Sequence, residues 1–159
     1  MIDHQALEFL IEKAQKSRNS AGRDLAEQRQ IEEQLNAQIS MLQNYRNEYR
    51  QRLQNAMANG VSLLTIRDYQ RFLSSLDQAI EKAEIQVQLQ RGKVENSQQH
   101  LSSQQRKLLS FDTLSERRKK SELDLLNRRD QKQTDEMITN KVARRTIGDS
   151  SGFNLQEDA

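Results

Sequence analysis

Cysteine and proline are both missing from this 159-residue sequence, and glycine occurs only five times. Without cysteine the chain forms no disulfide and offers no thiolate chemistry. Without proline, and with so little glycine, almost nothing interrupts a helix. Aromatic residues make up 4% of the chain and tryptophan is absent, so a broad globular core cannot be filled. We therefore expect long helices that share a narrow apolar seam.

Long hydrophobic runs are also missing. The longest, around VSLLTI, is far below the ~18 residues of a membrane span. Acidic residues at Asp3, Glu8 and Glu12 interrupt the first fifteen residues, which argues against a secretory signal. These features predict a cytosolic protein without direct membrane insertion.

Motifs for catalysis and for cofactor binding do not occur in the sequence. It contains no glycine-rich phosphate loop, no nucleophile elbow and no HExxH pattern. The two histidines, His4 and His100, have no cysteine partner and no ligand-like spacing, so we expect both to be solvated. The sequence predicts a protein that is not an enzyme and that holds no metal or cofactor.

Two runs of apolar residues, each at alternating spacings of four and three, dominate the chain. The first begins at Leu7 and ends at Ala56, and eleven of its fifteen positions are apolar. The second begins at Ile66 and passes through Phe111. Each run predicts a helix with a coiled-coil seam. The second has three polar exceptions, seven residues apart: Gln90, Ser97 and Gln104.

Asn59-Gly60 separates the two runs and is the strongest helix stop in the sequence. Glycine there supplies a left-handed cap, and Ser62 can cap the following helix. A short turn between two striped helices predicts an all-α fold, a long antiparallel two-helix coiled coil, or αα-hairpin. Folding at residue 60 places position i opposite about position 120 − i.

This rule sets the expected domain organisation. One hairpin should cover residues 1–145, with a first helix at about 3–58, a turn at 59–62 and a second helix at about 63–145. The second helix should outrun the first over 118–145, a C-terminal overhang with nine basic and five acidic residues. The remaining residues, 146–159, carry three acids and no base, and we expect a disordered acidic tail.

Tyr45 and Phe72 each lie one position off their seam, while Tyr49 lies on it. The hairpin rule brings these rings together near the turn, with Tyr45 and Phe72 across from each other. Two interpretations remain open, because the rings can widen the core or form an exposed patch for a partner. A two-helix rod has little width to hide them, which favours the partner site.

The run SERRKKSELDLLNRRDQK, residues 115–132, interleaves basic and acidic side chains and has no aromatic residue. Nucleic-acid binding is therefore disfavoured. A solvated helix face and docking onto an acidic protein surface remain as alternatives.

LQNYRNEYRQRLQNAMANG, followed by LLTIRDYQRFLSSLDQAIEKAE, resembles the signature of the FliJ family, small coiled-coil components of the bacterial flagellar export apparatus. LDLLNRRDQKQTDEM resembles the family's basic C-terminal helix. The resemblance implies a non-enzymatic stalk, adaptor and chaperone escort at the cytoplasmic face of the inner membrane. Its implied partners are the hexameric export ATPase of the FliI family, the cytoplasmic domain of the FlhA-family export-gate protein, and export chaperones, but no nucleic acid.

Two sets of site residues are expected, the first implied by the resemblance and the second by the unpaired basic overhang. Eight match the family's gate-contact surface: Gln38, Leu42, Tyr45, Tyr49, Phe72, Leu76, Ala79 and Ala83. Six residues, one just before the overhang and five within it, are expected at the ATPase ring, the arginines meeting carboxylates and the leucines meeting the inner wall: Arg117, Arg118, Leu125, Leu126, Arg128 and Arg129. Two other functions remain open: a stalk of a virulence-type secretion apparatus, and a nucleic-acid-associated coiled coil.

Overall fold

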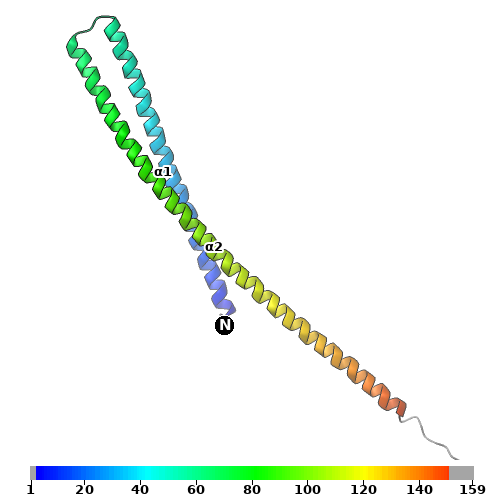
Figure 1. The fold of residues 1–159 in the computed structure, drawn as a ribbon. Coiled ribbons are helices and arrows are strands. Elements are labelled where there is room, and N and C mark those ends of the chain that lie inside the picture. Colours follow the sequence, from blue (N-terminus) through cyan, green and yellow to red (C-terminus); the bar gives the residue numbers. More distant parts are fainter. Residues whose placement is uncertain (1–2, 151–159) are drawn as a thin grey trace, which may run out of the picture. The chain divides into compact units, whose positions relative to one another are not determined.

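A computed structural model describes residues 3–150, nearly all of which belong to two helices, α1 (His4–Ala58) and α2 (Leu63–Ser150) (Figure 1). No strand occurs in this part of the chain, which confirms the all-α prediction. The chain divides into two compact units, a hairpin unit, Met1–Leu109, and a C-terminal unit, Ser110–Ala159.

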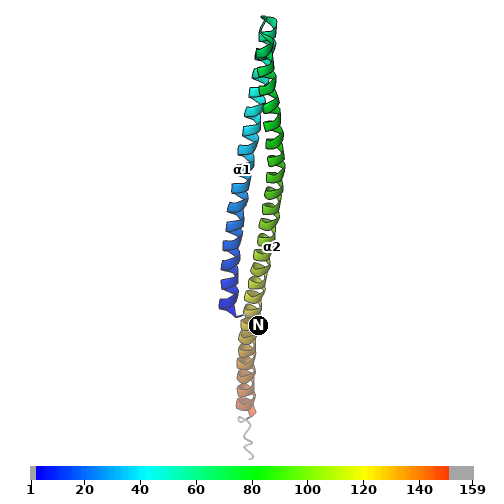
Figure 2. The same cartoon turned by 90° about the vertical axis from the view of Figure 1, so that its left-hand side faces the viewer.

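In the hairpin unit, α1 and the first part of α2 run side by side in opposite directions (Figures 1 and 2). The connection follows from its sequence. The Asn59 N–H donates to the Asn55 carbonyl at 3.1 Å, and Gly60 then takes a φ of 75°, which L side chains rarely adopt. Ser62 opens α2, since its carbonyl accepts from the Ile66 N–H at 3.3 Å. Asn59-Gly60 is therefore the turn that the sequence predicts.

The two predicted seams form the core of the hairpin unit. Every seam position from Leu7 to Ala56, and from Ile66 to Leu108, is buried or half-buried. None of the described side chains is completely enclosed, because two helices alone cannot surround one. The buried apolar residues are Leu7, Ala14, Ala21, Leu25, Leu76, Ile80, Ala83, Val87 and Leu108.

Polar residues interrupt this seam and bond across it. Gln90, only 5% exposed, donates from Nε2 to the Gln28 backbone carbonyl at 2.9 Å and to Gln28 Oε1 at 2.8 Å. Two helical turns further along α2, the Ser97 hydroxyl donates to Asp24 Oδ2 at 3.1 Å. Buried polar pairs of this kind favour one register over its neighbours, because a slipped hairpin leaves them unsatisfied.

The cross-helix contacts test the pairing rule directly. Gln28 meets Gln90 where the rule gives 92, and Asp24 meets Ser97 where it gives 96. Two ion pairs extend the comparison: Arg46 Nε lies 3.0 Å from Asp77 Oδ1, and Arg91 Nε lies 3.5 Å from Glu32 Oε1. The observed partners differ from the rule by at most three residues, or less than one helical turn.

In the C-terminal unit, α2 continues as helix and every residue from Lys119 to Ser150 is exposed. The helix ends five residues beyond the expected end at 145, so the expectation of disorder is wrong for 146–150. Gly148 costs only about 1 kcal/mol relative to alanine in a helix, and the Thr146 hydroxyl donates back to the Val142 carbonyl at 3.1 Å. The rest of the expected tail, 151–159, lies outside the described residues.

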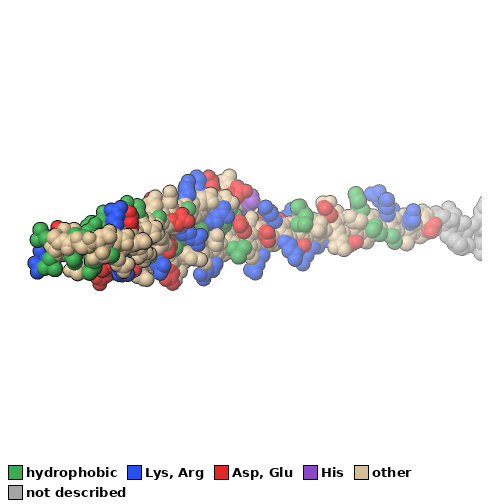
Figure 3. Space-filling view, turned by 90° about the horizontal axis from the view of Figure 1, so that it is seen from above, with side chains coloured by type: hydrophobic (Ala, Val, Ile, Leu, Met, Phe, Trp, Pro, Cys, Tyr) green, Lys and Arg blue, Asp and Glu red, His purple; other side chains and the backbone are tan. Residues whose placement is uncertain are grey.

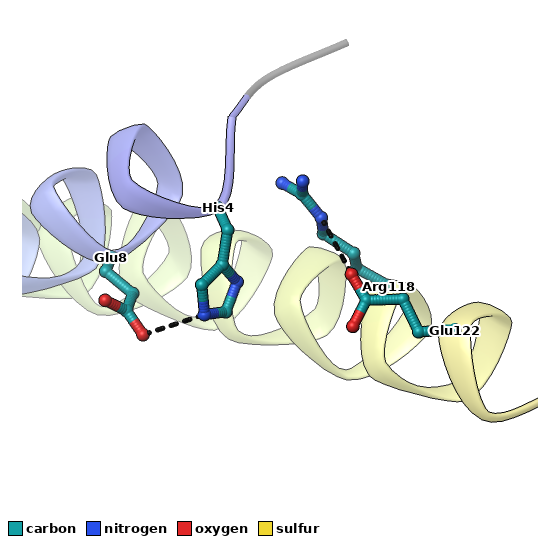
Figure 4. Close-up of polar contacts among 4 residues, drawn as sticks. All are labelled: His4, Glu8, Arg118 and Glu122. Carbon is teal, nitrogen blue, oxygen red and sulfur yellow. Dashed lines mark ion pairs between the residues drawn. The ribbon is translucent and has the colours of Figure 1, made fainter. Parts of the chain in front are cut away.

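Both helices carry ion pairs between residues that are one helical turn apart (Figure 4). On α1, His4 Nε2 lies 3.1 Å from Glu8 Oε1, a contact that is ionic only when the imidazole is protonated. On α2, Arg118 Nε lies 3.6 Å from Glu122 Oε1. Such solvent-exposed pairs stabilise a helix only slightly.

Candidate partner-binding surfaces

Four aromatic side chains near the turn form an aromatic patch, which we define as Tyr45, Tyr49, Tyr69 and Phe72. Tyr49 is its centre. Its ring lies 4.4 Å from the Phe72 ring, centroid to centroid, and 6.4 Å from the Tyr69 ring, with interplanar angles of 54° and 52°. These tilted arrangements are ones that aromatic pairs prefer, so the rings hold one another across the two helices.

The patch faces solvent at two of its residues. Tyr45 is 46% exposed and Phe72 is 42% exposed, whereas Leu42 and Leu73, their neighbours on the seams, are half-buried. This confirms the expectation that the rings one position off the seam remain accessible. The exposed rings are therefore available to a partner, while Tyr49 belongs mainly to the hairpin.

The ring contacts differ from the expectation in one respect. Phe72 packs on Tyr49, and Tyr45 makes no ring contact within the described residues. The pairing rule places Phe72 opposite residue 48, one position from Tyr49 and three from Tyr45. Tyr69, a position of the second seam that was not among the expected site residues, also joins the patch. The sequence contains a sign of this contact, because Tyr69 and Phe72 are three residues apart and so lie on one face of the helix.

The other expected gate-contact residues differ in how much of each side chain is exposed. Gln38 is exposed, and Leu42 and Ala79 are half-buried. Leu76 and Ala83 are each 8% exposed and lie in the seam. Those two side chains present little surface, so their contribution to any contact is to hold the helices in place.

Charged groups surround the aromatic patch. The Arg52 guanidinium lies 5.1 Å from the centroid of the Tyr49 ring, and its Nη2 is 2.8 Å from Glu48 Oε1. Arg46 is paired with Asp77 across the hairpin, although the geometry at its buried Nε is not that of a hydrogen bond. The result is an apolar centre with a polar rim, the arrangement typical of protein interfaces.

The six residues expected at the ATPase ring lie in the C-terminal unit and form what we call the basic surface. Arg117, Leu125 and Arg128 come together around one shallow hollow, which Lys120 and Asp124 also line. Leu125 is 58% exposed and Leu126 is 55% exposed. The other three residues, Arg118, Leu126 and Arg129, do not line this hollow. They each follow a hollow residue by one position and so lie about 100° further round the helix.

Within residues 3–150, no three His, Asp or Glu side chains gather in a group that could hold a metal ion. Among the same residues, no helix combines the length and the apolar character needed to cross a bilayer.

The fold and these surfaces define the class of protein: an α-helical hairpin whose exposed features are an aromatic patch and a basic helix face. The chain belongs to the FliJ family, because the family model described as Flagellar FliJ protein matches residues 3–146. Two relatives carry the name Flagellar FliJ protein. The one from Salmonella typhi is 34% identical over 145 residues, and the one from Escherichia coli (strain K12) is 32% identical over 145 residues. Each alignment covers 91% of this chain and 99% of the relative. Membership in this family supports a role in flagellar protein export.

Proposed function

We propose that this chain is a non-enzymatic stalk and adaptor of the flagellar export apparatus, which couples the export ATPase ring to the membrane export gate. The observation that carries the proposal is the separation of two accessible surfaces. The aromatic patch belongs to the hairpin unit, and the basic surface belongs to the C-terminal unit. Each unit therefore carries one candidate surface for one of the two partners.

The aromatic patch is the proposed site for the cytoplasmic domain of the gate protein. Exposed aromatic residues carry much of the binding energy at protein interfaces, and Tyr45 and Phe72 are each more than two-fifths exposed. The surrounding ion pairs leave an apolar centre for the partner to cover. The Tyr49 ring packs against the Phe72 ring, so Tyr49 contributes by fixing the position of Phe72.

Tyr45→Ala tests this site with little risk to the fold, because Tyr45 makes no ring contact in the described part of the chain. Isothermal titration with the purified gate cytoplasmic domain should show an affinity loss of about 2 kcal/mol, the size of an aromatic hot spot. Leu89→Ala is the matched control, since Leu89 is 66% exposed on the same hairpin and far from the patch. Equal affinity for the two variants would refute the site.

The basic surface is the proposed site for the ATPase ring. Its arginines are suited to carboxylates, and the exposed Leu125 and Leu126 supply the apolar contact that a purely electrostatic site lacks. The double variant R128E/R129E should abolish stimulation of ATP hydrolysis by the purified ring, and should leave gate binding unchanged. L125S/L126S should weaken the stimulation at every salt concentration, because the contribution of the two leucines is not electrostatic.

A matched control for both variants is I85S/L89S, in which two exposed apolar residues of the hairpin unit change. Ile85 is 56% exposed and Leu89 is 66% exposed, so the fold should tolerate the change. If this control lowered ATPase stimulation as much as R128E/R129E, the ring contact would lie on the hairpin instead.

The same proposal places the protein at the cytoplasmic face of the inner membrane, where ring and gate meet. It includes the binding of empty export chaperones, which the family resemblance implies. The match to a flagellar family favours the flagellar apparatus over a virulence-type one. Pull-down of tagged full-length chain from cell extract, probed for the ATPase, the gate protein and the chaperones, tests the partner set together.

A further inference from the structure

The end of the hairpin exposes apolar side chains that no surface described above uses. Leu63 and Leu64 are each 71% exposed, and Met57 on the other helix is 55% exposed. We call these three residues the tip cluster. Single exposed apolar residues are ordinary, but here three lie within eight residues of sequence at a turn. Hydrophobic and basic side chains appear together at the left-hand end of the surface in Figure 3, which is the turn of the hairpin.

Arginines accompany the tip cluster. Residues 50–71 contain four arginines and a single acid, Asp68, for a net charge of +3. Arg52 is paired with Glu48, whereas Arg50, Arg67 and Arg71 form no ion pair within residues 3–150. The first turn of α2 has no acidic residue. The tip is thus apolar at its end and positively charged just behind it.

The spacing along the helices matches a membrane interface. At 1.5 Å per residue, Arg67 lies about 6 Å along the axis from Leu63, and Arg71 lies about 12 Å from it. Arg50 lies about 12 Å from the end of α1 at Ala58. Interfacial segments bury apolar side chains about 5–10 Å deep and keep arginine in the headgroup layer. Leucines at the tip with arginines one to two turns behind have this arrangement.

We propose that the hairpin tip docks onto an anionic phospholipid bilayer, with Leu63 and Leu64 entering the interface and the arginines contacting lipid phosphates. A bilayer is the favoured occupant over a protein, because the arginines without an ion pair lie behind the apolar end on both helices, where lipid phosphates meet them. The contact is shallow, since the backbone groups of the turn must stay hydrated. It departs from the expectation that no part of the chain enters a membrane.

A local probe is needed, because the basic surface of the C-terminal unit also attracts anionic vesicles. The chain has no tryptophan, so L64W gives full-length protein with a single reporter at the tip. On vesicles containing phosphatidylglycerol, its fluorescence should shift to the blue and be quenched by brominated acyl chains. L89W is the matched control, since Leu89 is nearly as exposed and lies away from the tip, and its emission should not change.

Variants separate the apolar part of the contact from the electrostatic part. In the R128E/R129E background, which removes two arginines of the basic surface, L63S/L64S should weaken vesicle binding of the full chain about tenfold or more, while I85S/L89S leaves it unchanged. Each of Arg50→Gln, Arg67→Gln and Arg71→Gln should weaken it about fivefold on anionic vesicles and leave neutral vesicles unaffected. The proposal is overturned if the L64W signal stays that of water on anionic vesicles, or if L63S/L64S in the R128E/R129E background binds them as well as I85S/L89S in the same background. Loss of gate binding in L63S/L64S with normal vesicle binding would also overturn it, by assigning the tip to a protein.

Discussion

Replacing Tyr49 with alanine should destabilise the hairpin far more than replacing Tyr45, although the two tyrosines are one helical turn apart. Tyr49 is half-buried and contacts both Phe72 and Tyr69. Removing its ring exposes roughly 60–100 Å² of apolar surface, which amounts to about 2 kcal/mol at ~25 cal/mol per Å². The lost ring pairs add about 0.5 to 1.5 kcal/mol. We therefore expect Tyr49→Ala to lower the free energy of unfolding by about 2.5 to 3.5 kcal/mol, and Tyr45→Ala by less than about 1 kcal/mol.

Urea unfolding followed by circular dichroism at 222 nm measures both values. Amide hydrogen exchange of residues 45–75 shows whether the loss is local to the patch. A double-mutant cycle of Tyr49 and Phe72 should give a coupling energy of about 0.5 to 1.5 kcal/mol. Equal destabilisation by Tyr45→Ala and Tyr49→Ala, or no coupling in the cycle, would refute the assignment of Tyr49 to the hairpin and Tyr45 to a partner.

Four further substitutions test the turn and the polar seam by the same unfolding assay. Gly60→Ala should cost about 1 kcal/mol because Gly60 has a φ of 75°, and an added Cβ meets nothing within 4 Å, so the cost is conformational. Gly92→Ala, inside α2 with equally open space, should instead stabilise by about 0.5 to 1 kcal/mol, and the same sign at both glycines would contradict the account. Gln90→Leu should stay within about 1 kcal/mol of the natural protein, since half-buried Gln28 can hydrate, whereas Gln90→Ala should lose about 2 kcal/mol by leaving a cavity. A large loss in Gln90→Leu would mean that its hydrogen bonds contribute more than the packing.

The hairpin could be predicted from sequence because its rules are local. A four-three apolar spacing fixes which face of a helix is buried, and Gly60 fixes where the chain reverses. The spacing does not fix the register of the two helices to better than one turn. The register depends on particular pairs such as Gln28 with Gln90. It also determines that Phe72 packs on Tyr49. The helix end was missed because a glycine near 148 resembles a stop, but a single glycine costs too little to end a helix.

The partner surfaces could be predicted only in part. The exposure of Tyr45 and Phe72 follows from their offset from the seams, since a two-helix rod covers little beyond the seam itself. Leu76 and Ala83 were expected at the same surface, yet they lie on the seam and are buried. The tip cluster was overlooked because VSLLTI looks like the start of a second apolar run, whereas the seam begins only at Ile66, and Leu63 and Leu64 before it are exposed. Which partner covers each surface depends on the other protein, and no single sequence contains that information.

We propose that one chain binds gate and ring through two surfaces, one in each unit. The most direct test measures both activities on two full-length variants, Y45A/F72A and R128E/R129E. Affinity for the gate cytoplasmic domain and stimulation of the export ATPase are the readouts. We expect Y45A/F72A to lose gate affinity and keep ATPase stimulation, and R128E/R129E to do the reverse. If either variant lost both activities while remaining folded by circular dichroism, or if neither lost any, the two-surface account would be contradicted.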